Sequence, residues 1–300
     1  MKNMSIEPKK KIFSGVATAV VTPFCDEGID YMALERIIEM QIEGGVDALV
    51  FCGTTGESVT LSEEEKKQLF SFSVKAVASR VPVIIGCASN CHTTTMRLSS
   101  AAIDAGADAL LCVSPYYNKG TPRGIAVCYR EISSLGAPVI IYNVPSRTGV
   151  DISFDILKQL ANEENLCAVK ECAGVCRIGA ECVEFSDSYS IYCGNDAEML
   201  PSFSVGAAGA ISVISNVYPK LVKQMYDSYK NGDVVKAQSI YCRLSRMTSL
   251  LFEATSPAPV KYAMCRMGLC ENSLRLPLSV IEESLCKKID AEMKKIEQNI

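Results

Sequence analysis

The stretch EGGVDALV (43–50) places two glycines between an amphipathic segment and a short apolar run. The same order returns in DAGADALL (104–111) and in VGAAGAIS (205–212). A glycine just past a helix supplies the left-handed backbone that caps it, and the apolar run that follows has the length of a strand. We interpret the three stretches as a weak internal repeat that marks successive βα units.

Eight such apolar runs are spaced along the chain. Each is short, rich in Val, Ile and Ala, and does not alternate with polar residues, which is typical of strands buried on both faces. They lie at 15–22, 46–52, 81–87, 107–113, 137–144, 166–170, 189–194 and 207–213. Amphipathic stretches between them predict helices, for example over 31–43 and 62–79, the second of which begins with the capping signature SEEE.

Eight βα units within about 230 residues predict an α/β fold, a closed (β/α)8 TIM barrel. The alternative is an open, doubly wound sheet, but no G-x-G-x-x-G follows any of the runs. After residue 233 the strand signals stop, and helical patterns continue to Ile300 with one break at 256–259. We therefore expect a catalytic barrel over 1–233 and a C-terminal all-helical appendage over 234–300.

Composition excludes several classes of function. The net charge of −4 gives no basic surface for nucleic acid or for an anionic membrane, and no run approaches the roughly 18 residues that a spanning helix needs. The 15 cysteines are scattered through apolar runs without the spacing of a disulfide framework, which predicts reduced thiols in the cytoplasm. Because there is no C-x-x-C pair, no metal site is expected.

The amino terminus allows two interpretations. Three lysines at 9–11 precede IFSGVATAVV (12–21), which has the order of a secretory signal with an A-x-A pattern. The alternative is a basic tail followed by the first buried strand. The cysteine content favours the second interpretation.

Polar residues collect just after several of the apolar runs. Function in a TIM barrel lies at the carboxyl ends of the strands, so these segments are the candidates for a site. They are GTTGES (53–58), SPYYNKG (114–120), YNVPSRTG (142–149), VKECAG (169–174) and GND (194–196). The set is rich in hydroxyl groups. The single histidine, His92, lies outside it at the start of a helical pattern, so a histidine-based mechanism is not expected.

Lys170 ends the apolar run LCAVK (166–170). An amine at this position must lose its hydration, form an ion pair with a carboxylate, or take part in a reaction. Burial disfavours the charged form, and the neutral amine can attack a carbonyl group to form a Schiff base. The alternative is an ion pair at the end of a strand. Because adjacent strand residues point to opposite faces, Glu171 is a poor partner for such a pair.

Three hydroxyl residues and one arginine can assist this amine. Tyr142 ends the preceding run, and without a histidine the proton transfers fall to hydroxyl groups of this kind. Thr54 and Thr55 stand between glycines, where they can bind a small carboxylate and relay a proton, or simply shape a turn. Arg147 can clamp a second carboxylate or be a solvated surface residue.

Together these motifs resemble the pyruvate-dependent class I aldolase/lyase family. GTTGES, SPYYNK, YNVPSRTG and VKECAG follow one another in the family's order over nearly the whole chain. Within this family, the arginine of YNVPSRTG is similar to that of one branch. That branch condenses pyruvate with L-aspartate-4-semialdehyde in the diaminopimelate route of lysine biosynthesis. The two alternatives are a sister aldolase that acts on a sugar acid and a catalytically silent regulatory barrel.

The resemblance implies four catalytic residues. Lys170 would condense with pyruvate, and Tyr142 would donate and accept protons. Thr54 and Tyr117 would complete a hydroxyl relay with Tyr142, with Tyr117 supplied by a neighbouring subunit. The resemblance therefore also implies an assembly, a homotetramer made of two tight dimers.

Four further residues would bind substrate. Thr55 and the backbone at Ile211 would hold pyruvate, Arg147 would position the semialdehyde, and Gly194 would shape the pocket floor. The imine with pyruvate would be covalent, so no separate cofactor is implied.

The chain departs from the family's usual sequence at Cys172, at Asn195, where an acidic residue is frequent, and in the region of lysine regulation. Cys172 replaces a common alanine after the lysine, which we expect to be harmless. Lysine-regulated members bind inhibitor with a carboxylate that is missing among the residues of this region, which are Glu63, Lys66, Asn90 and Thr94. We therefore predict that inhibition by lysine is weak or absent.

Overall fold

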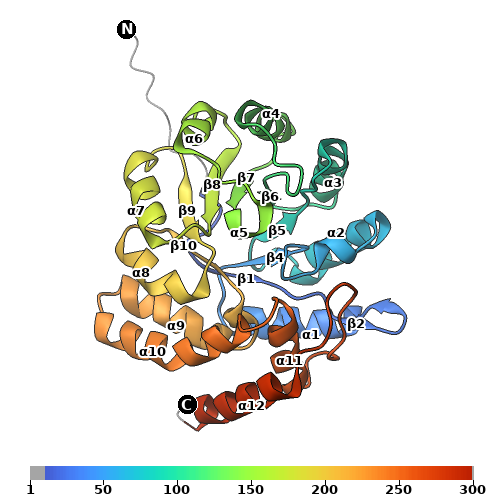
Figure 1. The fold of residues 1–300 in the computed structure, drawn as a ribbon, viewed down its shortest axis with the longest axis vertical. Coiled ribbons are helices and arrows are strands. Elements are labelled where there is room, and N and C mark those ends of the chain that lie inside the picture. Colours follow the sequence, from blue (N-terminus) through green and yellow to red (C-terminus); the bar gives the residue numbers. More distant parts are fainter. Residues whose placement is uncertain (1–10, 299–300) are drawn as a thin grey trace.

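The structure, a computed structural model, describes residues 11–298. Its centre is a closed barrel of eight parallel strands in the order β1-β10-β9-β8-β7-β6-β5-β4 (Figure 1). The strands are β1 (Gly15–Ala19), β4 (Ala48–Phe51), β5 (Val83–Gly86), β6 (Ala109–Val113), β7 (Val139–Asn143), β8 (Leu166–Glu171), β9 (Ser190–Cys193) and β10 (Gly209–Ser212). Each lies in or at the edge of one of the eight apolar runs, so the predicted TIM barrel is confirmed.

Helices surround the barrel and follow its strands in sequence (Figure 1). They are α1 (Tyr31–Glu43), α2 (Glu63–Val77), α3 (His92–Asp104), α4 (Pro122–Ser133), α5 (Pro145–Thr148), α6 (Phe154–Leu160), α7 (Val175–Glu184), α8 (Met199–Ser204) and α9 (Pro219–Lys230). The short hairpin of β2 (Phe24–Cys25) and β3 (Gly28–Ile29) was not predicted, because two-residue strands carry no periodic signal.

The helix ends follow from local sequence. Ser62 and Glu65 form the capping box at the start of α2, each side chain bonding to the other's backbone N–H. Gly45, Gly106 and Gly206 stand between a helix and the next strand with φ of +81°, +92° and +107°. The repeat of glycines in the sequence therefore marks the left-handed turns between helices and strands, as predicted.

The core has two layers because strand residues alternate between the two sides of the barrel. One cluster includes Ala168, Ile140 and Ile211 and fills the barrel interior; the ring of Phe13 stacks on that of Tyr192 there, with centroids 4.1 Å apart. The larger cluster lies between strands and helices and includes Val169. Residues that lie an even number of positions from Ala168 along β8, and their counterparts on the other strands, therefore point into the barrel.

Three helices follow the barrel in sequence, α10 (Val234–Leu251), α11 (Ala258–Arg266) and α12 (Glu283–Glu297). Helix α10 packs against α9 and α12, and α11 packs against α12 (Figure 1). The helical character of residues after 233 is confirmed, whereas the division into two domains at that position stays a prediction.

The first described residues lead directly into β1, whose five residues are all buried. The lysines at 9 and 10 lie outside the described residues. Within residues 11–298 no helix has the length and apolar character needed to cross a membrane. The cysteines are free thiols.

Candidate active site

Lys170 and Tyr142 lie side by side on neighbouring strands. They are register partners of β8 and β7, and both share the phase of residues that point into the barrel. Lys170 is 7% exposed and Tyr142 6%. The Lys170 Nζ atom lies 4.4 Å from the centre of the Tyr142 ring. The structure thus places a buried amine and a buried phenol together at the carboxyl end of the barrel, where function is expected.

Glu171 lies on the other side of β8, as the strand alternation predicted. Its carboxylate accepts hydrogen bonds from Asn143 Nδ2 at 3.0 and 2.9 Å and from the Ala173 backbone N–H at 2.6 Å. Arg177 Nε is 3.7 Å from Glu171 Oε2. Because Glu171 is engaged outside the barrel, it does not serve as the partner of Lys170.

The Tyr142 hydroxyl is held in its protonated form. Burial raises its pKa above the ordinary value, and this effect exceeds the opposing effects of the Lys170 charge and of a hydrogen bond with Thr54. A phenol that keeps its proton at neutral pH can donate it and take it back during a reaction. Tyr142 therefore interacts with both Thr54 and Lys170, and the three residues lie at the ends of three different strands.

The GTTGES segment forms a compact turn after β4. The backbone N–H of Glu57 donates to Thr54 O at 3.1 Å, and Thr22 Oγ1 donates to Gly56 O at 2.7 Å. Thr55 is buried inside this turn, at 6% exposure. Thr54 therefore takes part in a turn and also interacts with Tyr142, so the two interpretations are compatible for this residue.

Thr54 and Arg147 line one cavity of about 180 Å³. Arg147 lies in the short helix α5, which follows β7, and its side chain is exposed. Tyr116 also lines this cavity. A cavity lined by hydroxyl residues and a guanidinium suits a small carboxylated substrate. Lys170 and Tyr142 are not among the residues that line it.

Gly194 closes one side of the lysine's surroundings. A Cβ atom at position 194 would lie 2.9 Å from Lys170 Cε and 2.3 Å from Cys172 Sγ, so a larger residue would displace both side chains. Ile211 is buried in β10 and belongs to the interior cluster. The sequence did not indicate Cys172 as a neighbour of Lys170 and Gly194, because that contact depends on the closing of the barrel.

One predicted catalytic residue, Tyr117, does not line the cavity, and one buried carboxylate, Asp196, was not predicted to have a role. Tyr117 is 89% exposed with φ of +74°, and it does not line the cavity in which Tyr116 is found. Asp196 is buried, and its carboxylate accepts hydrogen bonds from the backbone N–H groups of Val213 and Ile214, at 3.0 and 2.8 Å. The sequence showed Asp196 within GND but not that it orders the segment after β10.

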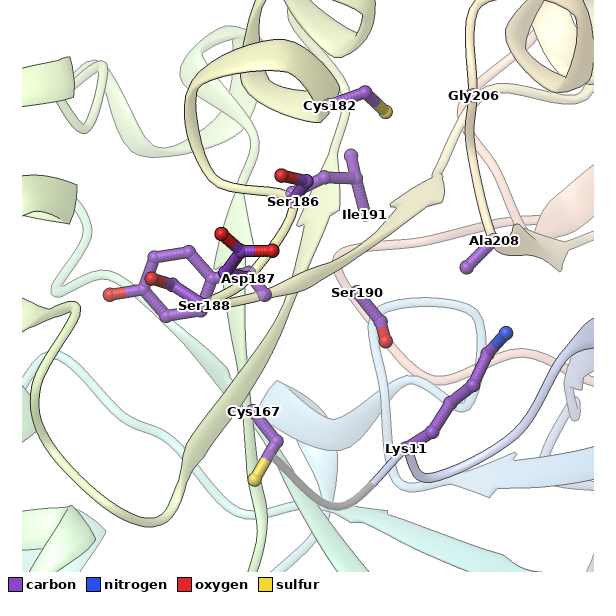
Figure 2. Close-up of a pocket in the computed structure, with 11 residues that line it drawn as sticks. Lys11, Cys167, Cys182, Ser186, Asp187, Ser188, Ser190, Ile191, Gly206 and Ala208 are labelled. Carbon is purple, nitrogen blue, oxygen red and sulfur yellow. The ribbon is translucent and has the colours of Figure 1, made fainter. Parts of the chain in front are cut away.

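A second cavity, of about 340 Å³, lies at the opposite end of the barrel (Figure 2). Its lining includes Ser190 at the start of β9, Cys167 near the start of β8, and Lys11 and Asp187. None of the predicted site residues lines it.

The region in which lysine-regulated family members were expected to bind the inhibitor contains an ion pair between Arg97 and Glu63. Arg97 Nη2 lies 2.7 Å from Glu63 Oε1 and 3.3 Å from Thr94 Oγ1. The Arg97 hydrogen bond lowers the pKa of Glu63. Glu63 is the carboxylate that could have replaced the missing one, and it is already paired. Weak or absent inhibition by lysine stays a prediction.

Behind Lys170, two buried carboxylates share one arginine. Arg177 Nε donates to Glu181 Oε1 at 2.7 Å and lies 3.7 Å from Glu171. Glu181 Oε2 is buried without a hydrogen-bond partner among the described residues. Burial raises the pKa of Glu181 to about 8, and the charge of Glu171 adds to this effect. Glu181 therefore retains a proton at neutral pH.

This proton predicts a stability that falls with pH. The folded-state pKa of Glu181 is above its unfolded value of 4.5, so its contribution is complete below pH 4.5 and is lost as pH rises toward 8. Glu181→Gln, which cannot ionise, should raise the free energy of unfolding at pH 8.5 by about 2 kcal/mol relative to wild type. Urea unfolding at pH 5.5 and 8.5 measures this.

Glu184→Gln is the matched control, since Glu184 is on the same helix but pairs with Lys158 at the surface. It should leave the pH dependence of stability the same as in wild type, because both side chains of this pair are exposed. Equal pH dependence in Glu181→Gln and wild type would show that Glu181 is ionised in the folded protein.

Comparisons with known proteins agree with this geometry. The model of the dihydrodipicolinate synthetase family matches residues 12–296. The 4-hydroxy-tetrahydrodipicolinate synthase of Magnetococcus marinus is 40% identical over 287 residues, which cover 95% of this chain and 98% of that protein. The enzyme of the same name from Alkaliphilus oremlandii is 40% identical over 294 residues, 96% of this chain and 100% of that protein.

A solved structure is similar over the same extent. The crystal structure of dihydrodipicolinate synthase from Aquifex aeolicus superimposes with a TM-score of 0.92 at 38% identity. The match covers 95% of this chain and 98% of that one. The similarity therefore includes the barrel and the carboxyl-terminal helices together.

Proposed function

The chain belongs to the dihydrodipicolinate synthetase family, and on this premise we propose which of its residues carry out the family's reaction. The chain is a Schiff-base-forming lyase with the activity of a 4-hydroxy-tetrahydrodipicolinate synthase. It condenses pyruvate with L-aspartate-4-semialdehyde, the step that commits aspartate semialdehyde to diaminopimelate and lysine.

The observation that carries the assignment of residues is the buried contact between Lys170 and Tyr142. The Lys170 amine attacks the keto carbon of pyruvate through its nitrogen lone pair, and loss of water from the carbinolamine gives an imine. Removal of a methyl proton then gives an enamine, whose carbon attacks the aldehyde of the second substrate. The imine itself accepts the electrons, so the proposed steps use no separate cofactor.

Tyr142 is placed to move the protons of these steps. Its hydroxyl keeps a proton because burial raises its pKa, and Thr54 forms a hydrogen bond with it. Tyr142 donates to the hydroxyl that leaves the carbinolamine and accepts a proton as the enamine forms, with Thr54 as the next member of the relay.

Two carboxylated substrates need two anion sites. Thr55 and the backbone at Ile211 are proposed to hold the pyruvate carboxylate, and Gly194 leaves room for it beside Lys170. Arg147 is proposed to bind the semialdehyde carboxylate, a role supported by its place in the same cavity as Thr54. A planar guanidinium can hold a carboxylate through two parallel hydrogen bonds.

Tyr117 is proposed to enter the relay of a neighbouring subunit. Its side chain is 89% exposed on a left-handed backbone, so it is available to another chain rather than to its own Tyr142. This arrangement requires an assembly, for which we propose a homotetramer of two tight dimers. We also propose a cytoplasmic location, which the free thiols support.

The substrate assignment is tested by one pair of reactions. Pyruvate with L-aspartate-4-semialdehyde should be turned over to a cyclic product, whereas pyruvate with N-acetylmannosamine should give no condensation product. Arg147 is the proposed reason, because it binds a carboxylate that the sugar lacks. Mass spectrometry of both mixtures measures the products. Faster turnover of the sugar would replace this assignment with that of a sugar-acid aldolase.

A further inference from the structure

The GTTGES turn is joined to the carboxyl-terminal helices by a buried ion pair. Lys261 of α11 and Glu57 of the turn have fully buried side chains, and Lys261 Nζ lies 2.6 Å from Glu57 Oε1. The backbone N–H of Arg275 donates to the other carboxylate oxygen, Oε2, at 3.2 Å. A carboxylate three residues after Thr54 is thus held by the chain that follows the barrel.

The side chains of Lys261 and Arg275 also contact residues on either side of this turn in the sequence. Lys261 Nζ lies 4.1 Å and Arg275 Cζ 4.4 Å from the ring centre of Phe24, which is 2% exposed. Arg275 Nη1 donates to Thr60 O at 3.2 Å and to Glu65 Oε2 at 2.9 Å. Residues before and after Glu57 are therefore attached to one carboxyl-terminal segment.

Glu57 is coupled to Thr54 through the backbone. It has φ of +51°, a left-handed conformation that costs free energy in glutamate and persists only where surrounding contacts impose it. Its N–H donates to Thr54 O at 3.1 Å. At the preceding Gly56, a Cβ atom would lie 3.2 Å from Thr22 Oγ1 and from the Val20 carbonyl oxygen. A movement of the Glu57 backbone would therefore also displace Thr54 and Thr55.

Stability alone does not explain a fully buried pair of charges. Removing both charges from water costs as much free energy as their attraction returns, and apolar side chains of the same size often serve stability equally well. Burial accordingly lowers the pKa of Lys261, while the Glu57 charge opposes that effect. What the pair supplies is a defined position for the carboxylate, and hence for the turn.

We propose that Glu57, Lys261 and Arg275 are positioning residues for the reaction, which hold Thr54 against Tyr142 and Thr55 against the keto acid. The segment after the barrel then supports the reaction, although none of its residues contacts the substrates in this proposal. This inference rests on the proposed roles of the two threonines.

Steady-state kinetics of Glu57→Gln test the inference. The amide has the shape of the carboxylate but cannot accept hydrogen bonds from both Lys261 and the Arg275 N–H. We expect the KM for pyruvate to rise about tenfold, the equivalent of one lost interaction, and the KM for the semialdehyde to stay within about twofold. A merely structural role would lower the unfolding temperature without separating the two KM values.

Two further variants keep the test decisive. Glu57→Gln combined with Lys261→Met buries no charge and should fold even if Lys261→Met alone does not; it should show the same raised KM for pyruvate. Arg266→Met is the matched control, since Arg266 lies on the same helix in an exposed pair with Asp290 at 3.0 Å. It should keep both wild-type KM values.

Wild-type KM for pyruvate in folded Glu57→Gln and in the double variant would overturn the inference. Thr55→Val separates this failure from a failure of the proposed function. If Thr55→Val raises the KM for pyruvate and the Glu57 variants do not, only the positioning role is wrong. If Thr55→Val also has no effect, the proposed pyruvate site itself is wrong.

Discussion

Lys170→Met should lower kcat on the order of 10⁴-fold or more, the scale expected when a covalent nucleophile is removed. Lys170 is 7% exposed and lies on the interior of the barrel, so methionine can fill its space without a cavity. The fold should therefore persist while the imine cannot form. Borohydride added with pyruvate should attach one reduced pyruvate to the wild-type chain and none to the variant, as measured by the intact mass.

Peptide mapping of the reduced adduct locates the modified lysine. Lys119 is the informative control because it is an exposed lysine in the SPYYNKG segment, near Gly149. Lys119→Met should be trapped as fully as wild type. An adduct on Lys119, or trapping that survives in Lys170→Met, would contradict the assignment of Lys170.

Tyr142→Phe should lower kcat by about 10²–10³-fold while the imine still forms, although more slowly, because it removes a proton-transfer group but not the nucleophile. Thr54→Val should have an effect of the same kind, since Thr54 is the hydrogen-bond partner of Tyr142. Borohydride trapping reports imine formation, and stopped-flow mixing with the semialdehyde reports the later steps. The two measurements separate the nucleophile from the relay.

Tyr192→Phe is the matched control for this substitution. Tyr192 also points into the barrel, but its hydroxyl donates to Phe13 O at 2.8 Å at the amino-terminal end. Losing that hydrogen bond should cost about 1 kcal/mol of stability and leave kcat within about twofold. Near-normal turnover in Tyr142→Phe would show that another group moves the proton.

Much of the fold could be predicted from short stretches of sequence. Strands buried on both faces read as apolar runs, and the glycines at 45, 106 and 206 mark turns that require a left-handed backbone. These signals are local, since they reflect the backbone preferences of a few adjacent residues. For the same reason the alternation of side chains along β8 placed Lys170 inside the barrel and Glu171 outside it.

The site required more than local signals. Lys170, Tyr142 and Thr54 could be named from their positions at strand ends, but their contacts depend on the register between β7 and β8 and on the closure of the barrel. A one-residue shift in register would have turned either side chain to the other face.

Only the tertiary structure decided which charges are buried and with which partners. Glu57 and Lys261 are 204 positions apart, and neither carries a sequence signal that distinguishes it from a solvated surface residue. The same holds for Glu181, whose retained proton follows from its burial beside Glu171. Burial of a charge depends on all the elements that pack around it. The sequence alone predicted the barrel and the residue that we propose as its nucleophile, whereas packing between distant segments determined which contacts hold the GTTGES turn in place.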